Sequence, residues 1–219
     1  MAATATYRGG GYLFGDTNVS LSGTSVRNSP LLVACSQYGS TPFLLPYDSQ
    51  GNDWRLEQSK LYGGVKLFVW STPQTTAITG TIGLTGDATN AVLWSGWQLS
   101  DVDYETVTST RTVNKAGGPG GPVQALAAGV GLSVGFVAAT STDTLETWSS
   151  SQNLNTPPSI YDSALSSNGV ADDGNTSFSV LWSTTEVYDA CSVTVCMRLK
   201  RFRPRGRTVL QASKRAAFR

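Results

Sequence analysis

Apolar residues in this chain recur mainly at every second position in short runs, which is the spacing of β-strands rather than helices. Residues 31–37 are apolar on both faces, which predicts a strand in the middle of a sheet. Residues 54–58 alternate apolar with charged side chains, Gly63 and Gly64 follow, and residues 65–71 return with a second apolar run. Two such runs around a glycine turn predict a β-hairpin.

Further strand-like segments follow up to residue 199. They are residues 76–84, 91–99, 106–113, 130–140 and 144–150, and then residues 177–183 and 191–199, which we interpret as a closing hairpin. Residues 151–175 are polar and rich in Pro, Asn and Asp, and we interpret them as an excursion loop with one helical turn near residues 160–165. Roughly ten to twelve short strands, with turn signals every ~8–12 residues, are typical of an all-β sandwich.

The apolar pattern also predicts which side of two strands faces the core. The residues expected to face the core are Val130, Leu132, Val134 and Phe136 on one strand and Cys191, Val193, Val195, Met197 and Leu199 on the last. Those expected to face outward are Ser192, Thr194, Cys196 and Arg198. We predict one antiparallel β-sandwich of jelly-roll type over residues 28–199, after a poorly packed N-terminal segment over residues 1–27 with one or two short strands.

Charge divides the chain into an acidic body and a basic arm. The 219 residues hold 16 Lys+Arg and 15 Asp+Glu, a formal net charge of +1. Eight of the basic residues and none of the acidic ones lie in residues 200–219, so residues 1–199 carry 8 − 15 = −7 and the arm carries +8. An arm of this kind seeks an acidic surface, a phosphate backbone or a neighbouring subunit.

The arm mixes charged with apolar residues, which favours a partner-docking segment over a purely solubilising tail. The residues that we expect to dock are Arg201, Phe202, Arg203, Arg205, Arg207, Leu210, Lys214 and Arg215. The rival hypotheses are a nucleic-acid contact through phosphate neutralisation and a disordered tail. Because an acidic body with a basic arm is self-complementary, we prefer protein–protein assembly to nucleic-acid binding.

The chain contains no histidine, which removes the Ser-His-Asp and Cys-His arrangements and most zinc sites. Two acidic clusters remain: Asp101, Asp103 and Glu105 would share one face of an extended segment, and Asp172 and Asp173 lie in a predicted loop. Either cluster could bind calcium or serve glycoside hydrolysis, but solvated turns are the preferred interpretation. We predict no enzymatic activity, no cofactor and no metal site.

Cysteine usage and hydropathy indicate a protein made in the cytosol and not inserted in a membrane. Cys35, Cys191 and Cys196 are an odd number, and the last two should face opposite sides of a strand, so we predict free, partly buried thiols. No segment approaches the ~18 consecutive apolar residues that span a bilayer, and the N-terminus shows no signal peptide.

Aromatic residues supply the candidates for sugar binding. Trp94 and Trp97 lie three positions apart in one predicted strand, so we expect one in the core and the other at the outer face. Trp148 and Tyr161 bracket the start of the polar excursion loop. An exposed aromatic ring beside Asn, Asp and Ser can stack a sugar ring, so Trp97, Trp148 and Tyr161 are the glycan-binding candidates, with simple packing as the alternative.

Six segments carry a resemblance to a known class of protein. They are LLVACSQ at residues 31–37, WRL at 54–56, GGVKLFVW at 63–70, VLWSGWQLSD at 92–101, GLSVGFVAA at 131–139 and ACSVTVCMRL at 190–199. In this order the chain resembles, over about residues 28–199, a β-sandwich module of minor tail and other virion proteins of actinobacterial phages. The resemblance implies a structural role in a virion assembled in the host cytoplasm, with other virion proteins as partners in a homo-oligomer or multi-copy assembly.

The expected function is therefore that of a non-enzymatic virion subunit, a minor tail or tail-tip protein anchored by its basic arm. Two alternatives stay open. One is an adhesion module that binds a cell-surface glycan, and the other is a capsid decoration protein whose arm grips the shell.

Overall fold

The computed structural model describes residues 3–13, 18–38, 45–62, 64–73, 76–85, 92–114, 123–125, 131–141, 145–148, 154–155, 164–172, 178–182 and 187–200. Within these residues the regular structure is β-strand, apart from the short 3-10 helix η1 (Tyr104–Thr106). All the strand pairings between them are antiparallel. The predicted all-β, antiparallel class is confirmed.

The strands of residues 4–100, which we call the first half, form two sheets. The large sheet has the order β1 (Thr4–Leu13), β8 (Val92–Ser100), β3 (Leu31–Tyr38), β6 (Val65–Thr72) and β5 (Arg55–Tyr62). The small sheet has the order β2 (Asn18–Ser20), β7 (Thr81–Thr85) and β4 (Leu45–Tyr47).

The strands of residues 108–197, which we call the second half, form two more sheets. The large sheet has the order β13 (Leu154–Asn155), β14 (Ala164–Asp172), β11 (Gly131–Ser141), β16 (Val187–Met197) and β9 (Thr108–Asn114). The small sheet has the order β10 (Val123–Ala125), β15 (Phe178–Trp182) and β12 (Leu145–Trp148). The helix η1 lies in the connection between the two halves.

The two halves share one strand order. Numbered from one within its own half, the first half has the orders 1-8-3-6-5 and 2-7-4. Subtracting eight from each strand number in the second half gives 5-6-3-8-1 and 2-7-4, which is the same order counted from the opposite edge of the large sheet. The described strands therefore repeat a single eight-stranded arrangement along the chain.

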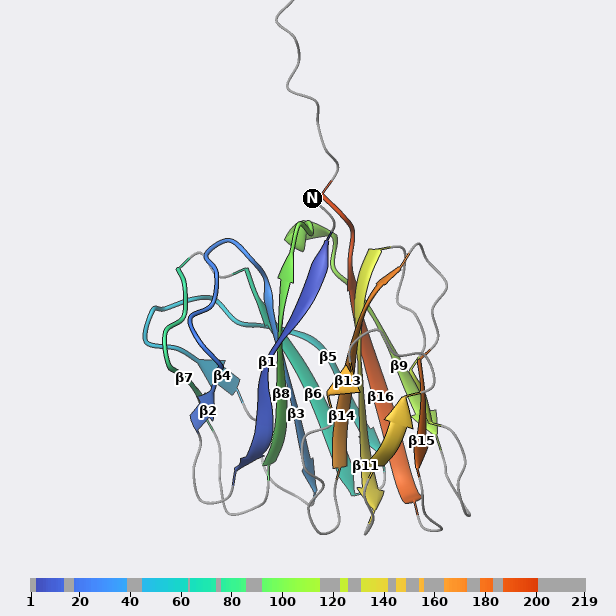
Figure 1. The fold of residues 1–219 in the computed structure, drawn as a ribbon. Coiled ribbons are helices and arrows are strands. Elements are labelled where there is room, and N and C mark those ends of the chain that lie inside the picture. The colour runs from blue at the N-terminus through green and yellow to red at the C-terminus, as the bar shows by residue number, and fades with distance from the viewer. Residues whose placement is uncertain are drawn as a thin grey trace, which may run out of the picture.

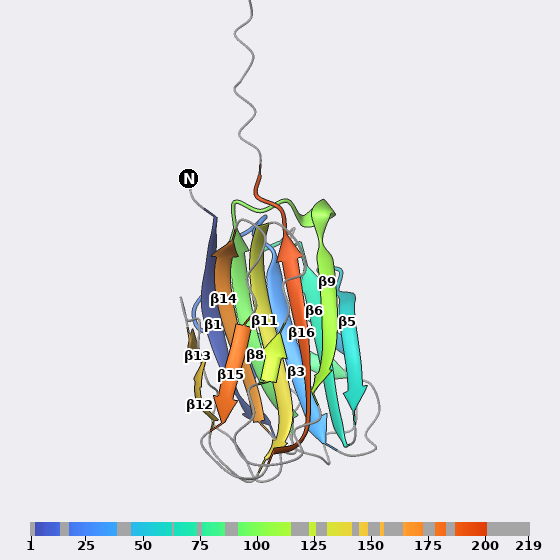
Figure 2. The ribbon, with the colours of Figure 1, turned by 90° about the vertical axis from the view of Figure 1, so that its right-hand side faces the viewer.

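The two large sheets pack face to face, and the small sheets lie outside them (Figures 1 and 2). The core between the large sheets is shared by the halves. Its fully or almost fully buried side chains include Leu67 and Trp97 from the first half and Leu132, Phe136 and Val193 from the second. Removal of this apolar surface from water is the main force that holds the halves together.

A second core fills the space between the two sheets of the first half. Leu31, Val33 and Cys35 of β3 pack there with Val19 and Ile82 of the small sheet. β3 is apolar on both faces because it is covered on both, and it pairs with β8 on one side and β6 on the other. Its predicted central position is confirmed.

The predicted hairpin over residues 54–71 is also confirmed. β5 and β6 pair antiparallel around the turn at Gly64. The register shifts between Leu56 and Gln58, so Glu57 forms a β-bulge. This bulge changes the direction of the Glu57 side chain, which accepts a hydrogen bond from Ser71.

The second core strand, β11, and the last strand, β16, lie side by side in the large sheet. Of the residues predicted to face the core, those buried are Leu132, Val134, Phe136, Cys191, Val193, Val195 and Met197. Val130 lies outside the described residues, and the prediction is wrong for Leu199, which is 44% exposed. Ser192, Thr194 and Cys196 were expected to face outward, but they are buried as well because β10 of the small sheet packs against β16.

The N-terminal segment is better packed than predicted. β1 pairs with β8 from Thr4 to Leu13, so it is an edge strand of the large sheet. The ring of Trp94 lies against Gly9, where an added Cβ would sit 2.9 Å from a ring carbon. The glycines thus make room for a tryptophan instead of forming a turn. The expected boundary at residue 27 falls between β2 and β3, inside the first half.

Two predictions for the end of the second half are wrong. The expected excursion loop over residues 151–175 contains β13 and β14, and β14 pairs with β11 from Ala164 to Asp172. The expected closing hairpin does not exist, because β15 belongs to the small sheet and β16 to the large one. The side chains of β14 are mostly small or polar, so its pairing follows from its place beside β11 and not from apolar alternation.

Candidate functional site

The basic arm begins at a fixed point between the two halves. An isolated antiparallel bridge joins Leu199 to Val102 of the connection. The amide of Asp103 donates to the carbonyl of Arg198 at 2.8 Å, and the amide of Lys200 donates to the carbonyl of Asp101 at 2.8 Å. Val102 is buried in the shared core, so the bridge anchors the start of the arm to both halves.

The connection places three carboxylates in the same turn as this bridge. Asp101 has a φ of 56°, which bends the chain sharply. Asp103 then caps η1, and its Oδ1 accepts a hydrogen bond from the Glu105 amide at 3.2 Å. The predicted extended arrangement of Asp101, Asp103 and Glu105 is therefore wrong, because a helical turn interrupts it.

A polar cluster ties η1 to the first half. Ser71 donates to Glu57 and accepts from the Tyr104 hydroxyl, with 3.0 Å between the two hydroxyl oxygens. Arg55 Nε lies 2.8 Å from Glu57 Oε1, and its guanidinium lies 4.6 Å from the centroid of the Tyr104 ring. Burial raises the pKa of Tyr104, so its hydroxyl keeps the proton that it donates.

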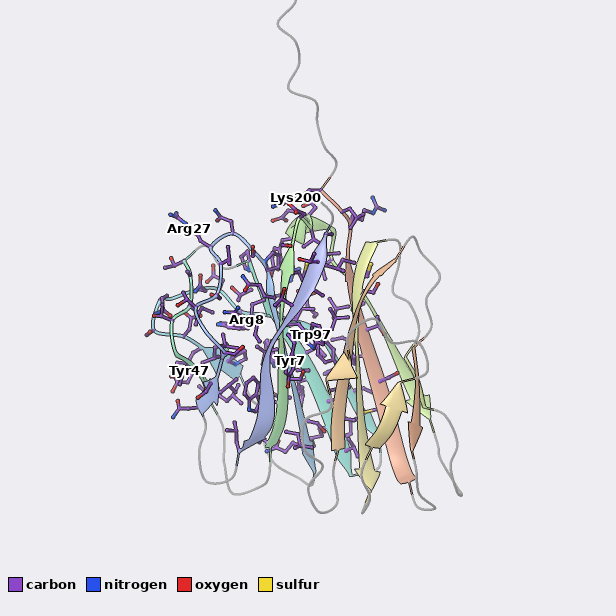
Figure 3. The ribbon with its side chains drawn as sticks, in the orientation of Figure 1. Tyr7, Arg8, Arg27, Tyr47, Trp97 and Lys200 are labelled. Atoms are coloured by element: carbon purple, nitrogen blue, oxygen red, sulfur yellow. The ribbon has the colours of Figure 1, made fainter. Side chains whose placement is uncertain are left out.

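We call the cluster of Arg55, Glu57, Ser71 and Tyr104 the clamp, because it holds η1 against β5 and β6. The Glu57 side chain is 7% exposed, and its carboxylate is bonded by Arg55 of β5 and Ser71 of β6. The clamp holds η1 of the connection in place. The bridge of Leu199 to Val102 holds the base of the arm against the same connection. Figure 3 shows Lys200 at the end of the molecule where the connection also lies.

The predicted docking residues belong to a part of the chain that the structure does not describe. They are Arg201, Phe202, Arg203, Arg205, Arg207, Leu210, Lys214 and Arg215. Their role stays a prediction. Sequence reasoning found the charge of the arm, but it missed the anchor at Val102, whose partner is distant along the chain.

Trp97 cannot stack a sugar at the surface. Its side chain is fully buried between the large sheets, with its ring centroid 5.4 Å from that of Tyr7 at an angle of 61° (Figure 3). Trp94, on the opposite face of β8, is only 5% exposed because the small sheet covers that face. The prediction of Trp97 as a glycan-binding residue is wrong. Trp148 lies in β12, and Tyr161 lies outside the described residues.

An aromatic residue that sequence reasoning missed lies on the outer face of the first small sheet. Tyr47 of β4 is 52% exposed, and its neighbour Leu45 is 42% exposed (Figure 3). Pro46 between them argues against a strand, but a proline is tolerated in an edge strand, which β4 is. In the structure Pro46 faces inward, and Leu45 and Tyr47 on either side of it face outward.

Among the described residues, no group of three or more His, Cys, Asp or Glu side chains is placed to hold a metal ion. Within the same residues, no helix is long and apolar enough to cross a membrane.

Comparisons with known proteins add no relatives. No family model, no curated protein and no solved structure matches the chain.

Proposed function

We propose that this protein is a non-enzymatic structural subunit of a virion, built from two jelly rolls in tandem and docked through its basic arm. The fold part of the proposal is supported by the strand order. A jelly roll arranges eight strands in two sheets with the orders 1-8-3-6 and 2-7-4-5. Each half of this chain has the orders 1-8-3-6-5 and 2-7-4, which differ only in that strand 5 adds to the other sheet.

The observation that carries the functional part is the anchored start of the arm. A tail that only solubilises needs no fixed origin. Here the bridge of Leu199 to Val102 and its two amide hydrogen bonds hold the last residues before the arm against the connection, where Val102 is buried. A subunit that docks by an arm gains from this arrangement, because an arm with a fixed origin loses less freedom when it binds.

The distribution of charge supports another copy of the chain as the partner of the arm. Residues 1–100 carry 5 − 5 = 0, whereas residues 101–199 carry 3 − 10 = −7. The arm over residues 200–219 carries +8. Its electrostatic complement is therefore the second half together with the connection, and the arm of one subunit binds this part of the next. Tail, tail-tip and capsid-decoration positions in a phage particle all fit this mode of assembly.

Deletion of residues 201–219 tests the proposal, because it keeps Lys200 and the anchoring bridge. We expect the full chain to form oligomers by sedimentation velocity at low salt and the truncated chain to be monomeric. Particles purified from the producing host should contain the full chain and lack the truncated one. A matched variant with the eight basic residues of the arm changed to Gln separates charge from length. Normal incorporation of both variants would overturn the proposal.

A further inference from the structure

The large sheet of the second half has an incompletely paired edge. β14 and β6 have the same place in the strand order, and each lies next to the fifth strand of its half. In the first half that strand, β5, pairs with β6 from Val65 to Ser71. In the second half β13 pairs only with Ser167 and Asn168 of β14. Within the described residues, the outer side of Gly169–Asp172 therefore has no partner strand, and its outward amides and carbonyls can pair with one.

This open edge lies at the end of the molecule where the arm begins. Asp172 pairs with Gly131 of β11, and the next residue of β11, Leu132, pairs with Met197 of β16. The arm begins shortly after Met197, at Lys200. β16, β11 and β14 are neighbours in one sheet (Figure 2). Since neighbouring strands lie ~4.8 Å apart, the open edge is about 10 Å from the strand that leads into the arm.

The other long edge strands of the large sheets are less open. The Ser109 hydroxyl of β9 donates to the Glu57 carbonyl of β5 at 3.1 Å, so these two edges lie against each other. On β1 the carbonyl of Arg8 accepts a hydrogen bond from the Ser22 amide at 2.6 Å. Arg8 also adds a positive charge to β1, which disfavours the approach of a basic segment. Among the described edges, β14 is thus the one best suited to receive the arm.

Charge and sequence both favour the arm as the added strand. Residues 116–197, which include β14, hold seven acidic and no basic residues, whereas the arm carries +8. Residues 207–209 of the arm have the sequence Arg-Thr-Val, and so do residues 111–113 of the edge strand β9. In both cases the triplet begins eight or nine residues after a member of the bridge between Val102 and Leu199. The connection leads such a segment into a sheet of the next half, so the arm has a matching segment with which to enter a sheet of another copy.

We propose that residues 207–210 of one copy form a strand that pairs antiparallel with Gly169–Asp172 of a second copy. This inference rests on the proposed function, in which the arm docks on another copy, and it names the docking surface. Residues 201–206 span up to about 20 Å when extended, which is enough to reach an edge on a facing copy. Because the arm and the open edge lie at the same end of the molecule, two facing copies exchange arms about a two-fold axis. Charge steers the arm, and backbone pairing holds it.

Proline substitutions test the backbone pairing without changing the charge. Thr208→Pro combined with Val209→Pro removes two successive amide donors, and one of any two successive amides in a strand faces its partner. We expect the dissociation constant of the oligomer, from sedimentation velocity at low salt, to rise about tenfold. The matched control is Ala216→Pro combined with Ala217→Pro, which alters the same arm outside the proposed strand. Its dissociation constant should stay within about twofold of that of the full chain.

Two further measurements locate the receiving edge and identify the donor of the arm. By hydrogen exchange, the amides of Gly169–Asp172 should be protected in the full chain and exchange faster in the chain truncated after Lys200. A mixture of two variants, Val209→Cys and Ala171→Cys, is then treated with a bismaleimide linker, which can join a new thiol of one variant to that of the other only between chains. The three native cysteines are buried and free, so they should not react in the folded protein.

Three outcomes would overturn the inference. They are unchanged oligomers of the Thr208 and Val209 double variant, equal exchange of the Gly169–Asp172 amides with and without the arm, and linking within a chain that carries both new cysteines but not between chains of the mixture. The last outcome would mean that the arm folds onto its own body. A truncated chain that still forms oligomers would instead overturn the proposed function. Loss of oligomers on truncation but not in the double variant would overturn only the inference, so the two failures are distinguishable.

Discussion

The two halves of the molecule have the same strand order and different charge. Both arrange eight strands as 1-8-3-6-5 and 2-7-4, and both contribute large side chains to one core. The first half is neutral, whereas residues 101–199 carry −7. Strand order follows from apolar alternation and backbone pairing, which leave the outward positions free to vary. The comparison therefore teaches that the arrangement sets the shape of each half, while the outward residues determine what that half binds.

The largest effect should come from the core that the halves share. Trp97 from the first half and Phe136 from the second are both fully buried there. We expect Trp97→Ala and Phe136→Ala each to lower the free energy of unfolding by about 3–5 kcal/mol. Because both halves bury their apolar faces in this one core, each variant should unfold in a single transition by calorimetry. Two separate transitions, with only one shifted by each variant, would show that the halves are independent domains.

Alkaline pH should destabilise the protein through buried thiols of both cores. The three cysteines are free and buried, so the prediction of free thiols is confirmed. Burial raises the pKa of Cys35, in the first-half core, and of Cys191, in the shared core, from 9.0 to about 12. Above pH 9 the unfolded chain releases protons that the folded chain keeps. The stabilising contribution is therefore complete below pH 9 and is lost as the pH rises towards 12.

We expect each of these two thiols to lower the folding equilibrium constant by up to about tenfold per pH unit between pH 9 and 12. Urea unfolding at successive pH values measures this slope. Cys35→Ala and Cys191→Ala should each reduce it, whereas a slope unaffected by either variant would contradict the assignment. A thiol reagent at pH 8 should label no cysteine of the folded protein and all of them in denaturant.

The sequence predicts the strands of the two halves unequally, for a physical reason. β3 could be predicted because both of its faces are buried, which makes its first five residues apolar. β14 has small and polar side chains, so local composition resembles a loop and only its pairing with β11 makes it a strand. The alternation of apolar and polar residues within one strand also does not reveal how many sheets are stacked in layers. Trp94 and Trp97 were expected to divide between core and surface, yet a third layer buries both.

The candidate sites were predictable only in part. The charge of the arm is a property of composition, so the sequence reveals it directly. Its anchor requires the pairing of Leu199 with Val102, which local patterns do not contain. Tyr47 is notable only when Gly83 is known to lie beside it on the neighbouring strand. Contacts between distant residues thus account for what sequence reasoning missed in both sites.

A smaller effect is expected at the clamp between the halves. Tyr104→Phe removes the hydroxyl that donates to Ser71 and keeps the ring beneath Arg55. We expect a loss of about 1 kcal/mol in the free energy of unfolding, the usual contribution of one part-buried hydrogen bond. Tyr47→Phe is the matched control, and its effect should be near zero because the Tyr47 side chain is half exposed. Equal losses in both variants, measured by urea unfolding, would argue against the clamp.

The smallest effect should follow from giving β7 of the first half the residue that β15 of the second half has at the same register position. Gly83→Val places in β7 the residue that β15 has at Val180. The new Cβ would overlap the far end of the Tyr47 side chain, but that ring is half exposed on an edge strand and can turn away. The gain in strand propensity offsets the lost contact, so we expect a change within about 1 kcal/mol. Stability is measured by urea unfolding, and the turning of the ring by a rise in the accessibility of the tyrosine to solvent.

A loss of stability well above about 1 kcal/mol would mean that the sheet holds Tyr47 in place and that Tyr47 serves chiefly to cover Gly83.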